Sequence, residues 1–228
     1  MRIGKLIWNS RKLVFLFFII GIVVESSPAQ SKYKSKPWSV GQWATYQITR
    51  NKKEMSVKYS LTGMEKLEGK TYYWLECRTV YQAETTISRM LLGQGEVLPK
   101  EVVIKNGNEP AMTMRAMLQK GLKPQIRKLP SHTDMEINKG YIGTEEVSVP
   151  AGKFKTIHSK LSPTVENESG EIWVSGQIPV LGTVKSSEYE GANKTRMILT
   201  GFGKSGAKTE ITEKPIEGEL PKPLIKKN

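Results

Sequence analysis

Residues 56–81 read SVKYSLTGMEKLEGKTYYWLECRTVY and contain the pattern that decides the fold. From Ser56 to Thr62, polar and apolar side chains alternate, which is the period of a β-strand with one face in water. Gly69 and Lys70 then turn the chain into an aromatic-rich run from Tyr72 to Tyr81, which favours a second strand. The stretch therefore predicts two successive strands joined by a turn.

Further strand patterns lie on both sides of this stretch. They are rich in β-branched and aromatic residues and are bounded by glycine, proline or other turn-forming residues. They cover residues 43–49, 85–92, 101–105, 145–149, 153–160, 171–175, 182–190 and 195–202. Pro150, Ala151 and Gly152 form a short connection that predicts a hairpin. The sequence thus indicates a mainly β fold, with α+β character supplied by one helix.

That helix is predicted over residues 110–121. Pro110 suits a first helical position, and Gly121 suits the end of a helix. Its apolar side chains recur at helical spacing at Ala111, Met114, Met117 and Leu118. Two interpretations stay open for this methionine-rich side. It packs on the domain core, or it forms a flexible lid over a hydrophobic cavity, because unbranched methionines repack around varied ligands.

The first 29 residues have the organisation of an export signal. Basic residues between Arg2 and Lys12 precede the apolar run Leu13–Val24, and Ser27 and Ala29 supply the small side chains that a signal peptidase recognises. The run would span about 18 Å as a helix, whereas a bilayer core is about 30 Å thick. We expect cleavage after Ala29 and a periplasmic location in a bacterial cell envelope. A buried helix or an uncleaved anchor is the alternative.

The remaining chain is predicted to form one domain, residues 30–203, and a tail, residues 204–228. Aromatic residues disappear after Gly203, so the tail is expected to bury too little apolar surface to offset its ordering entropy and to stay mobile. The net charge is +13, and it falls to +10 without residues 1–29, which carry four bases and one acid. These bases are scattered, which argues against nucleic acid but allows contact with an anionic membrane surface.

The sequence predicts no catalytic or metal centre. Cys77 is the only cysteine, so the chain forms no internal disulfide and no cysteine cluster. His132 and His158 are the only histidines. Ser131, His132 and Asp134 have the residue types of a hydrolytic triad, but a triad is a spatial arrangement that adjacency in a loop does not build. We therefore expect a protein that is not an enzyme and needs no cofactor.

Three short sequence motifs, taken in their order along the chain, resemble those of a known group of proteins. They are VGQWATY at residues 40–46, VPAGKF at residues 149–154, and IPVLGTVK at residues 178–185, the last followed by a strand into residues 201–203. Across roughly residues 38–203 the chain resembles exported bacterial proteins related to the LolA/LolB-like half-barrels. The resemblance implies a curved antiparallel half-barrel whose concave side is covered by helical structure and holds a hydrophobic cavity. It also implies a binding or carrier protein without catalytic residues.

The expected ligand is a lipid or another hydrophobic small molecule, because each buried methylene of an acyl chain gains about 0.8 kcal/mol. Candidate lining residues on the sheet are Val57, Tyr59, Tyr73, Leu75 and Trp173. Candidate lid residues are Met114, Met117 and Leu118. For each of them, a filled core is the alternative. The competing function is a structural or scaffold subunit that holds a protein partner in the envelope.

Overall fold

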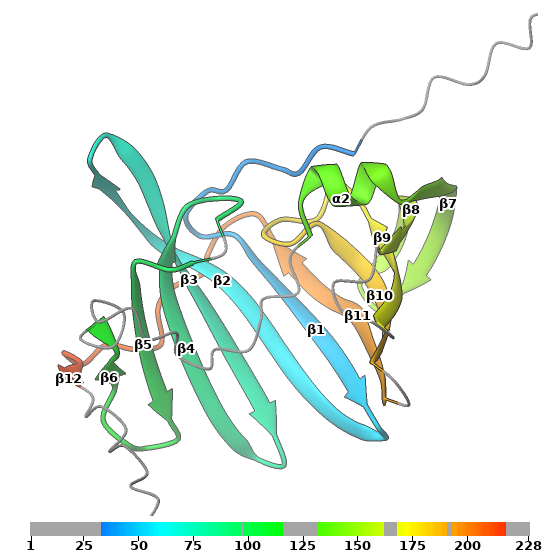
Figure 1. Cartoon of the computed structure of the whole chain (residues 1–228). Coiled ribbons are helices and arrows are strands. Elements are labelled where there is room, and N and C mark those ends of the chain that lie inside the picture. Colours follow the sequence, from blue (N-terminus) through cyan, green and yellow to red (C-terminus); the bar gives the residue numbers. More distant parts are fainter. Residues whose placement is uncertain (1–32, 97, 116–131, 162–167, 191–192, 218–228) are drawn as a thin grey trace, which may run out of the picture. The chain divides into compact units, whose positions relative to one another are not determined.

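The computed structural model describes residues 33–96, 98–115, 132–161, 168–190 and 193–217 (Figure 1). The chain divides into two units, residues 1–31 and residues 32–228, and the second unit contains all of the described structure. The predicted export signal lies outside the described residues. Within these ranges, no helix is both long enough and apolar enough to cross a bilayer.

Twelve strands form one sheet in the described part of the second unit. The first six in the chain are β1 (Trp43–Arg50), β2 (Lys53–Leu67), β3 (Lys70–Tyr81), β4 (Glu84–Leu92), β5 (Glu101–Asn106) and β6 (Met112–Thr113). The remaining six are β7 (Tyr141–Val149), β8 (Gly152–Leu161), β9 (Glu168–Val174), β10 (Thr183–Glu190), β11 (Asn193–Gly203) and β12 (Ile216–Glu217). Their order across the sheet is β12-β6-β5-β4-β3-β2-β1-β11-β10-β9-β8-β7.

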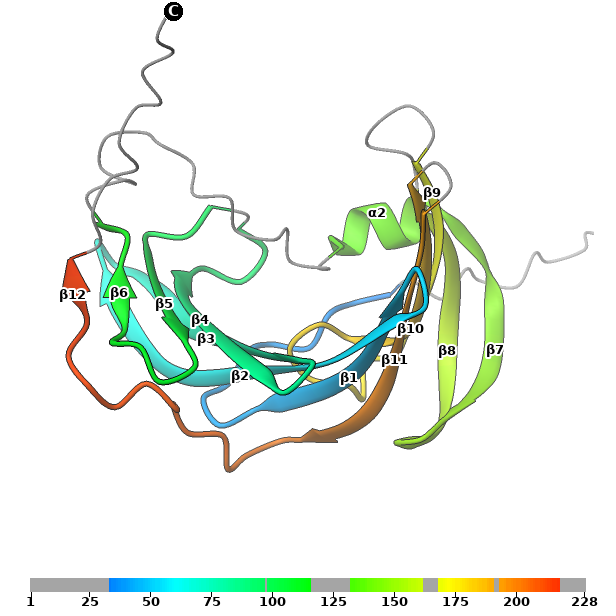
Figure 2. The same cartoon turned by 90° about the horizontal axis from the view of Figure 1, so that it is seen from below.

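The sheet is antiparallel except where β12 lies parallel to β6. Figure 2 shows it as a strongly curved surface, with the helix α2 (Asp134–Lys139) on its inner side. The mainly β fold with one curved antiparallel sheet is thus confirmed. The strands predicted from residue 43 to residue 105 and from residue 145 to residue 202 are present, with ends that differ by a few residues.

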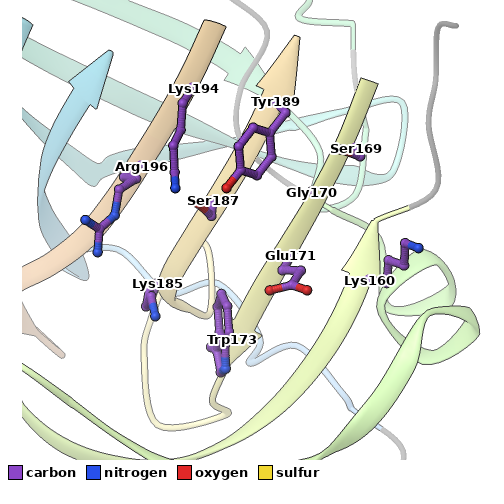
Figure 3. Close-up of a pocket in the computed structure, with 10 residues that line it drawn as sticks. All are labelled: Lys160, Ser169, Gly170, Glu171, Trp173, Lys185, Ser187, Tyr189, Lys194 and Arg196. Carbon is purple, nitrogen blue, oxygen red and sulfur yellow. The ribbon is translucent and has the colours of Figure 1, made fainter. Parts of the chain in front are cut away.

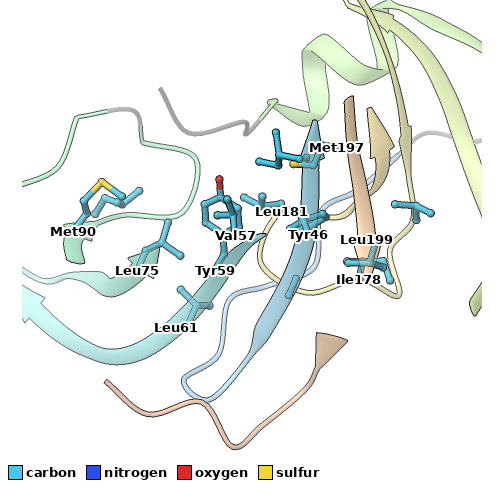
Figure 4. Close-up of a cluster of buried hydrophobic side chains, with 14 of the residues drawn as sticks. Tyr46, Val57, Tyr59, Leu61, Leu75, Met90, Ile178, Leu181, Met197 and Leu199 are labelled. Carbon is cyan, nitrogen blue, oxygen red and sulfur yellow. The ribbon is translucent and has the colours of Figure 1, made fainter. Parts of the chain in front are cut away.

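The register explains why alternating residues are buried. Ala44 pairs with Tyr59 and Tyr46 pairs with Val57, so the apolar positions of β1 and β2 lie on the same face. We call this the core face. Its side chains form one packed cluster, drawn in Figure 4, in which Tyr46, Leu61 and Leu75 are fully buried. The alternation read from the sequence therefore becomes a single apolar surface.

The core face is covered partly by connections rather than by helices. Ile178 and Leu181, from the connection between β9 and β10, are buried members of the core cluster. The hydroxyl of Tyr46 donates to the carbonyl oxygen of Thr183 at 3.1 Å at the end of the same connection. The indole of Trp38 packs edge-on against Tyr73, with ring centroids 5.7 Å apart. These contacts cover part of the core face in the middle of the sheet.

Helix α2 lies after the region where the helix was predicted. Thr133 begins it with a capping box in which Glu136 is the third residue, and Ile137 is its buried residue. Asn138 binds both main-chain polar groups of Tyr33, at 2.6 and 2.9 Å. A second apolar cluster, with Ile137 and Tyr33 among its members, packs there against β8 and β9. The helix thus holds the chain that precedes β1.

The helix predicted over residues 110–121 is wrong at its beginning. Met112 and Thr113 form β6, and the N–H of Met114 donates to the carbonyl oxygen of Val102 at 2.8 Å. Pairing with β5 satisfies the main chain here and outweighs the helical spacing of the side chains. From residue 116 onward the prediction lies outside the described residues.

The mobile tail predicted after Gly203 is wrong for residues 204–217. Ile211 is 3% exposed and packs against Ile87, Val103 and Ala111. The N–H of Ile216 donates to the carbonyl oxygen of Ala111 at 2.9 Å, next to the β12–β6 pairing. A few polar and apolar contacts therefore hold a segment whose overall composition is typical of disorder. Residues 218–228 lie outside the described residues.

Candidate functional site

A pocket of about 500 Å³ opens on the face of β8–β11 opposite to the core face (Figure 3). Its ten lining residues come from these four strands. They are Lys160, Ser169, Gly170, Glu171, Trp173, Lys185, Ser187, Tyr189, Lys194 and Arg196. Such a volume lies within the range of about 300–1,000 Å³ that is usual for small-molecule sites.

Strand alternation places these side chains on one surface. Ser186 pairs with Met197, which belongs to the core cluster, so the flanking residues Lys185 and Ser187 point to the other face. The same argument holds for β9, where Ile172 is buried beside α2 and Glu171 points away from it. We call this opposite surface the pocket face.

The pairings arrange the pocket face in cross-strand rows. One row runs from Arg196 through Ser187 and Glu171 to Lys160. A second row joins Lys194, Tyr189 and Ser169. A third row joins Lys185, Trp173 and His158. Lys160 and Arg196, which are 36 positions apart in the sequence, thus line the same pocket.

The pocket lining is strongly basic. Four of its side chains are cationic, and Glu171 is its one carboxylate. Lys160, Lys194 and Arg196 are exposed, so their charges face the solvent in the pocket. Within the described part of the chain, none of these four cations forms an ion pair. Basic side chains that gather around a pocket with one carboxylate among them can attract an anion.

Trp173 forms the rigid floor of the pocket. Its indole is 8% exposed and stacks on the imidazole of His158, with ring centroids 4.2 Å apart. The ammonium of Lys185 lies 4.2 Å from the Trp173 ring. The indole N–H donates to a carboxylate oxygen of Glu145 on β7. Neither the ring plane nor the N–H is therefore available to a ligand without rearrangement.

His158 is held between two carboxylates. Its Nδ1 lies 3.1 Å from Glu145 and its Nε2 lies 3.5 Å from Glu171. The Nε2 atom is buried and has no hydrogen-bond partner within the described residues. Glu171 therefore lies between the pocket and His158.

Tyr189 stands at the open side of the pocket. It is 41% exposed, and the ammonium of Lys194 lies 5.0 Å from its ring centroid. A hydrogen bond from Lys194 lowers the pKa of the Tyr189 phenol below its ordinary value. The pocket therefore presents an exposed aromatic ring beside its cations, and Figure 3 shows this ring beside Lys194 with its hydroxyl toward Ser187.

The structure separates the residues that were predicted to line a hydrophobic cavity. Val57, Tyr59 and Leu75 are 0–4% exposed members of the core cluster, and Tyr73 packs against it. Trp173 lies instead in the basic pocket on the other face. One predicted lid residue, Met114, packs against the core cluster. The other two, Met117 and Leu118, lie outside the described residues.

The triad-like residue types near His132 do not come together as a described site. The carboxylate of Asp134 accepts hydrogen bonds from the main chain and side chain of Ser35, which anchors the segment before β1. Ser131 lies outside the described residues. Among the described residues, no three His, Cys, Asp or Glu side chains are placed to share a metal ion.

Sequence reasoning missed nine of the ten pocket residues. The available signal was the alternation of basic and hydroxyl side chains at Lys185, Ser187 and Tyr189, continued by Lys194 and Arg196 in the next predicted strand. This signal shows that one face of a hairpin is wet and basic. It does not show that β8 and β9 complete a hollow beside that hairpin.

No family model matches the chain, and no curated protein matches it. Among solved structures, it is similar to a candidate lipoprotein from Parabacteroides distasonis, with 13% identity, a TM-score of 0.37 and coverage of 74% of this chain and 97% of that one. It is also similar to a candidate exported protein with a YmcC-like fold from Bacteroides fragilis, with 13% identity, a TM-score of 0.39 and coverage of 75% and 99%. A third similarity is to a chain of the Pseudomonas aeruginosa MucA/MucB complex, with 12% identity, a TM-score of 0.32 and coverage of 74% and 53%. At these values the comparisons assign neither a family nor an activity.

Proposed function

We propose that this chain is a non-catalytic binding protein of the bacterial envelope and that it binds an anionic ligand in the β8–β11 pocket. The observation that carries the proposal is the convergence of four cations and one carboxylate on a pocket of about 500 Å³. The envelope location is supported by the basic and apolar organisation of residues 1–29.

The charge of the pocket favours an anion over a lipid tail. Two opposite unit charges 4 Å apart attract each other by about 4 kcal/mol near a protein surface, and salt weakens this attraction. An acyl chain would instead need apolar space, and the candidate lining residues on the core face are packed against one another. Binding of a hydrophobic ligand or lipid, which the resemblance to LolA/LolB-like half-barrels implies, stays a prediction.

Isothermal titration calorimetry with citrate tests the proposal. The full chain is expressed, and the purified product is titrated at low and at physiological ionic strength. We expect saturable binding that weakens as salt rises. The double variant K194Q/R196Q is expected to lose about tenfold in affinity or more, which corresponds to about 1.4 kcal/mol.

The matched control is the double variant K66Q/K70Q. It removes the same charge from the exposed ends of β2 and β3, outside the pocket. We expect it to bind citrate as the unchanged protein does. Equal losses in both double variants would show a nonspecific charge effect and would overturn the pocket as the site. No binding by any variant would leave the structural or scaffold role as the better hypothesis.

A further inference from the structure

We propose that the ligand of the β8–β11 pocket is an acidic saccharide, in which anionic groups are separated by hydroxyl groups. This inference rests on the proposed function, because it specifies what kind of anion the pocket binds. The arrangement of the lining along the cross-strand rows carries it.

The cations stand at the two ends of one row rather than at its centre. Arg196 on β11 and Lys160 on β8 end the row, and Ser187 and Glu171 lie between them. Neighbouring strands lie about 4.8 Å apart, so the two ends are separated by about 14 Å at the main chain. Figure 3 shows Lys160 and Arg196 at opposite sides of the pocket, so an elongated ligand with separated charges matches the two ends better than a single small oxyanion does.

The centre of the row is built to accept hydrogen bonds. A carboxylate such as Glu171 only accepts them when ionised, and it repels an oxyanion placed beside it. A ligand hydroxyl, by contrast, is a donor that a carboxylate binds well. The hydroxyl of Ser187 adds a group that can donate or accept. The centre therefore suits hydroxyl groups, while both ends suit anions.

Tyr189 adds a surface for a sugar ring. This residue of the second row is 41% exposed, whereas the Trp173 indole is covered by His158 and Lys185. A pyranose ring presents apolar C–H groups on one face, and an exposed aromatic ring can bury them while its polar end stays in water. Among the described aromatic residues of the pocket, Tyr189 is therefore the one that can stack on a ligand.

A titration series tests the saccharide class against its alternatives. The purified product of the full chain is titrated with trigalacturonate, with maltotriose as the neutral counterpart, with inorganic phosphate and with phosphatidylglycerol vesicles. We expect trigalacturonate to bind about tenfold more tightly than phosphate or more, a difference of about 1.4 kcal/mol, and maltotriose not to bind measurably.

Three variants separate the roles of the pocket residues. E171Q should weaken trigalacturonate binding and strengthen phosphate binding, because it replaces a charged acceptor oxygen with an amide donor and removes a repulsive charge. Y189A should weaken trigalacturonate binding about fivefold, whereas Y189F, which keeps the ring, should retain most of the affinity. Circular dichroism of each variant checks that the sheet is intact.

The outcomes distinguish this inference from the proposed function. If phosphate binds as tightly as trigalacturonate and E171Q strengthens both, the pocket is a general oxyanion site, so the inference fails and the proposed function stands. If only the vesicles bind, the ligand is a lipid headgroup and the inference fails. If none of these anions binds, both fail.

Discussion

The hydroxyl of Thr209 donates a hydrogen bond of 2.6 Å to the carboxylate of Glu76, joining two positions 133 residues apart. Glu76 lies in the middle of β3 and is 2% exposed. The main-chain N–H of Glu210 donates to the same carboxylate at 3.1 Å, and the guanidinium of Arg78 pairs with Glu210 at 3.1 Å. A buried acidic side chain therefore positions the segment that follows the last long strand.

Replacing Glu76 with alanine is expected to destabilise the protein by about 1–3 kcal/mol, because two part-buried hydrogen bonds to its carboxylate are lost. Urea unfolding followed by circular dichroism measures this change. The control is E84A, which removes an exposed glutamate at the start of the neighbouring strand β4 and should change stability by less than about 0.5 kcal/mol. Equal effects of the two variants would contradict the anchoring role of Glu76.

Replacing Ile211 with alanine is expected to lower the free energy of unfolding by about 2–4 kcal/mol, the usual cost of emptying a buried aliphatic site. Ile211 is 3% exposed against β4 and β5, whereas Ile216 in the same segment is 55% exposed. I216A is therefore the matched control, with a much smaller expected loss. If residues 204–217 were a mobile tail, I211A would be as harmless as I216A.

Replacing Gly140 with alanine is expected to cost about 1–3 kcal/mol through steric overlap. A Cβ atom at Gly140 would overlap the carbonyl oxygen of Lys160, whose N–H donates to the Gly140 carbonyl oxygen at 2.7 Å. Gly143, three residues later, has open space where its Cβ would lie. Thermal unfolding of both variants measures the difference, and G143A should be neutral. A neutral G140A would show that α2 does not pack on β8 as described.

Replacing Tyr46 with phenylalanine tests a pH effect of the buried core. Burial raises the pKa of the Tyr46 phenol above its ordinary value of 10.0. The unfolded chain therefore ionises first, and the folded state loses stability as the pH rises above about 10. Y46F should lose about 1 kcal/mol at neutral pH with the hydrogen bond to Thr183, and its stability should then fall less steeply in alkali.

Urea unfolding of both proteins at a series of pH values from neutral upward measures this difference. Tyr33 is expected to behave similarly, because burial and the charge of Asp134 both raise its pKa. Parallel losses of stability in Y46F and the unchanged protein would rule out a contribution from Tyr46.

The local sequence pattern predicted the strands because a half-buried strand has apolar side chains on one face and polar side chains on the other, and these alternate along the chain. Val57, Tyr59 and Leu61 are apolar at every second position, and all three lie in the core cluster. The same pattern could not predict whether that surface encloses a cavity. A filled core and an apolar cavity use the same side chains, and the choice between them depends on contacts such as those of Ile178 and Leu181, which come from another connection.

Two errors arose where pairing with another segment outweighs local preference. Ala111 and Met114 have helical spacing, but this part of the chain pairs with the edge of β5 and joins the sheet. Residues 204–217 have the composition of a tail, but Glu76 and Ile87 provide the partners that order them. Neither Glu76 nor Ile87 is close in the sequence to residues 204–217, so no local window contains the information that orders this segment.

The sequence by itself determined the mainly β class, the positions of the long strands and the turn between β7 and β8, because each depends on neighbouring residues. Only the tertiary structure decided where the candidate site lies. Lys160, Glu171, Ser187 and Arg196 become one row through strand pairing and register, and register is set by contacts across the whole sheet. The basic pocket is therefore a property of how four strands are aligned, which no single strand encodes.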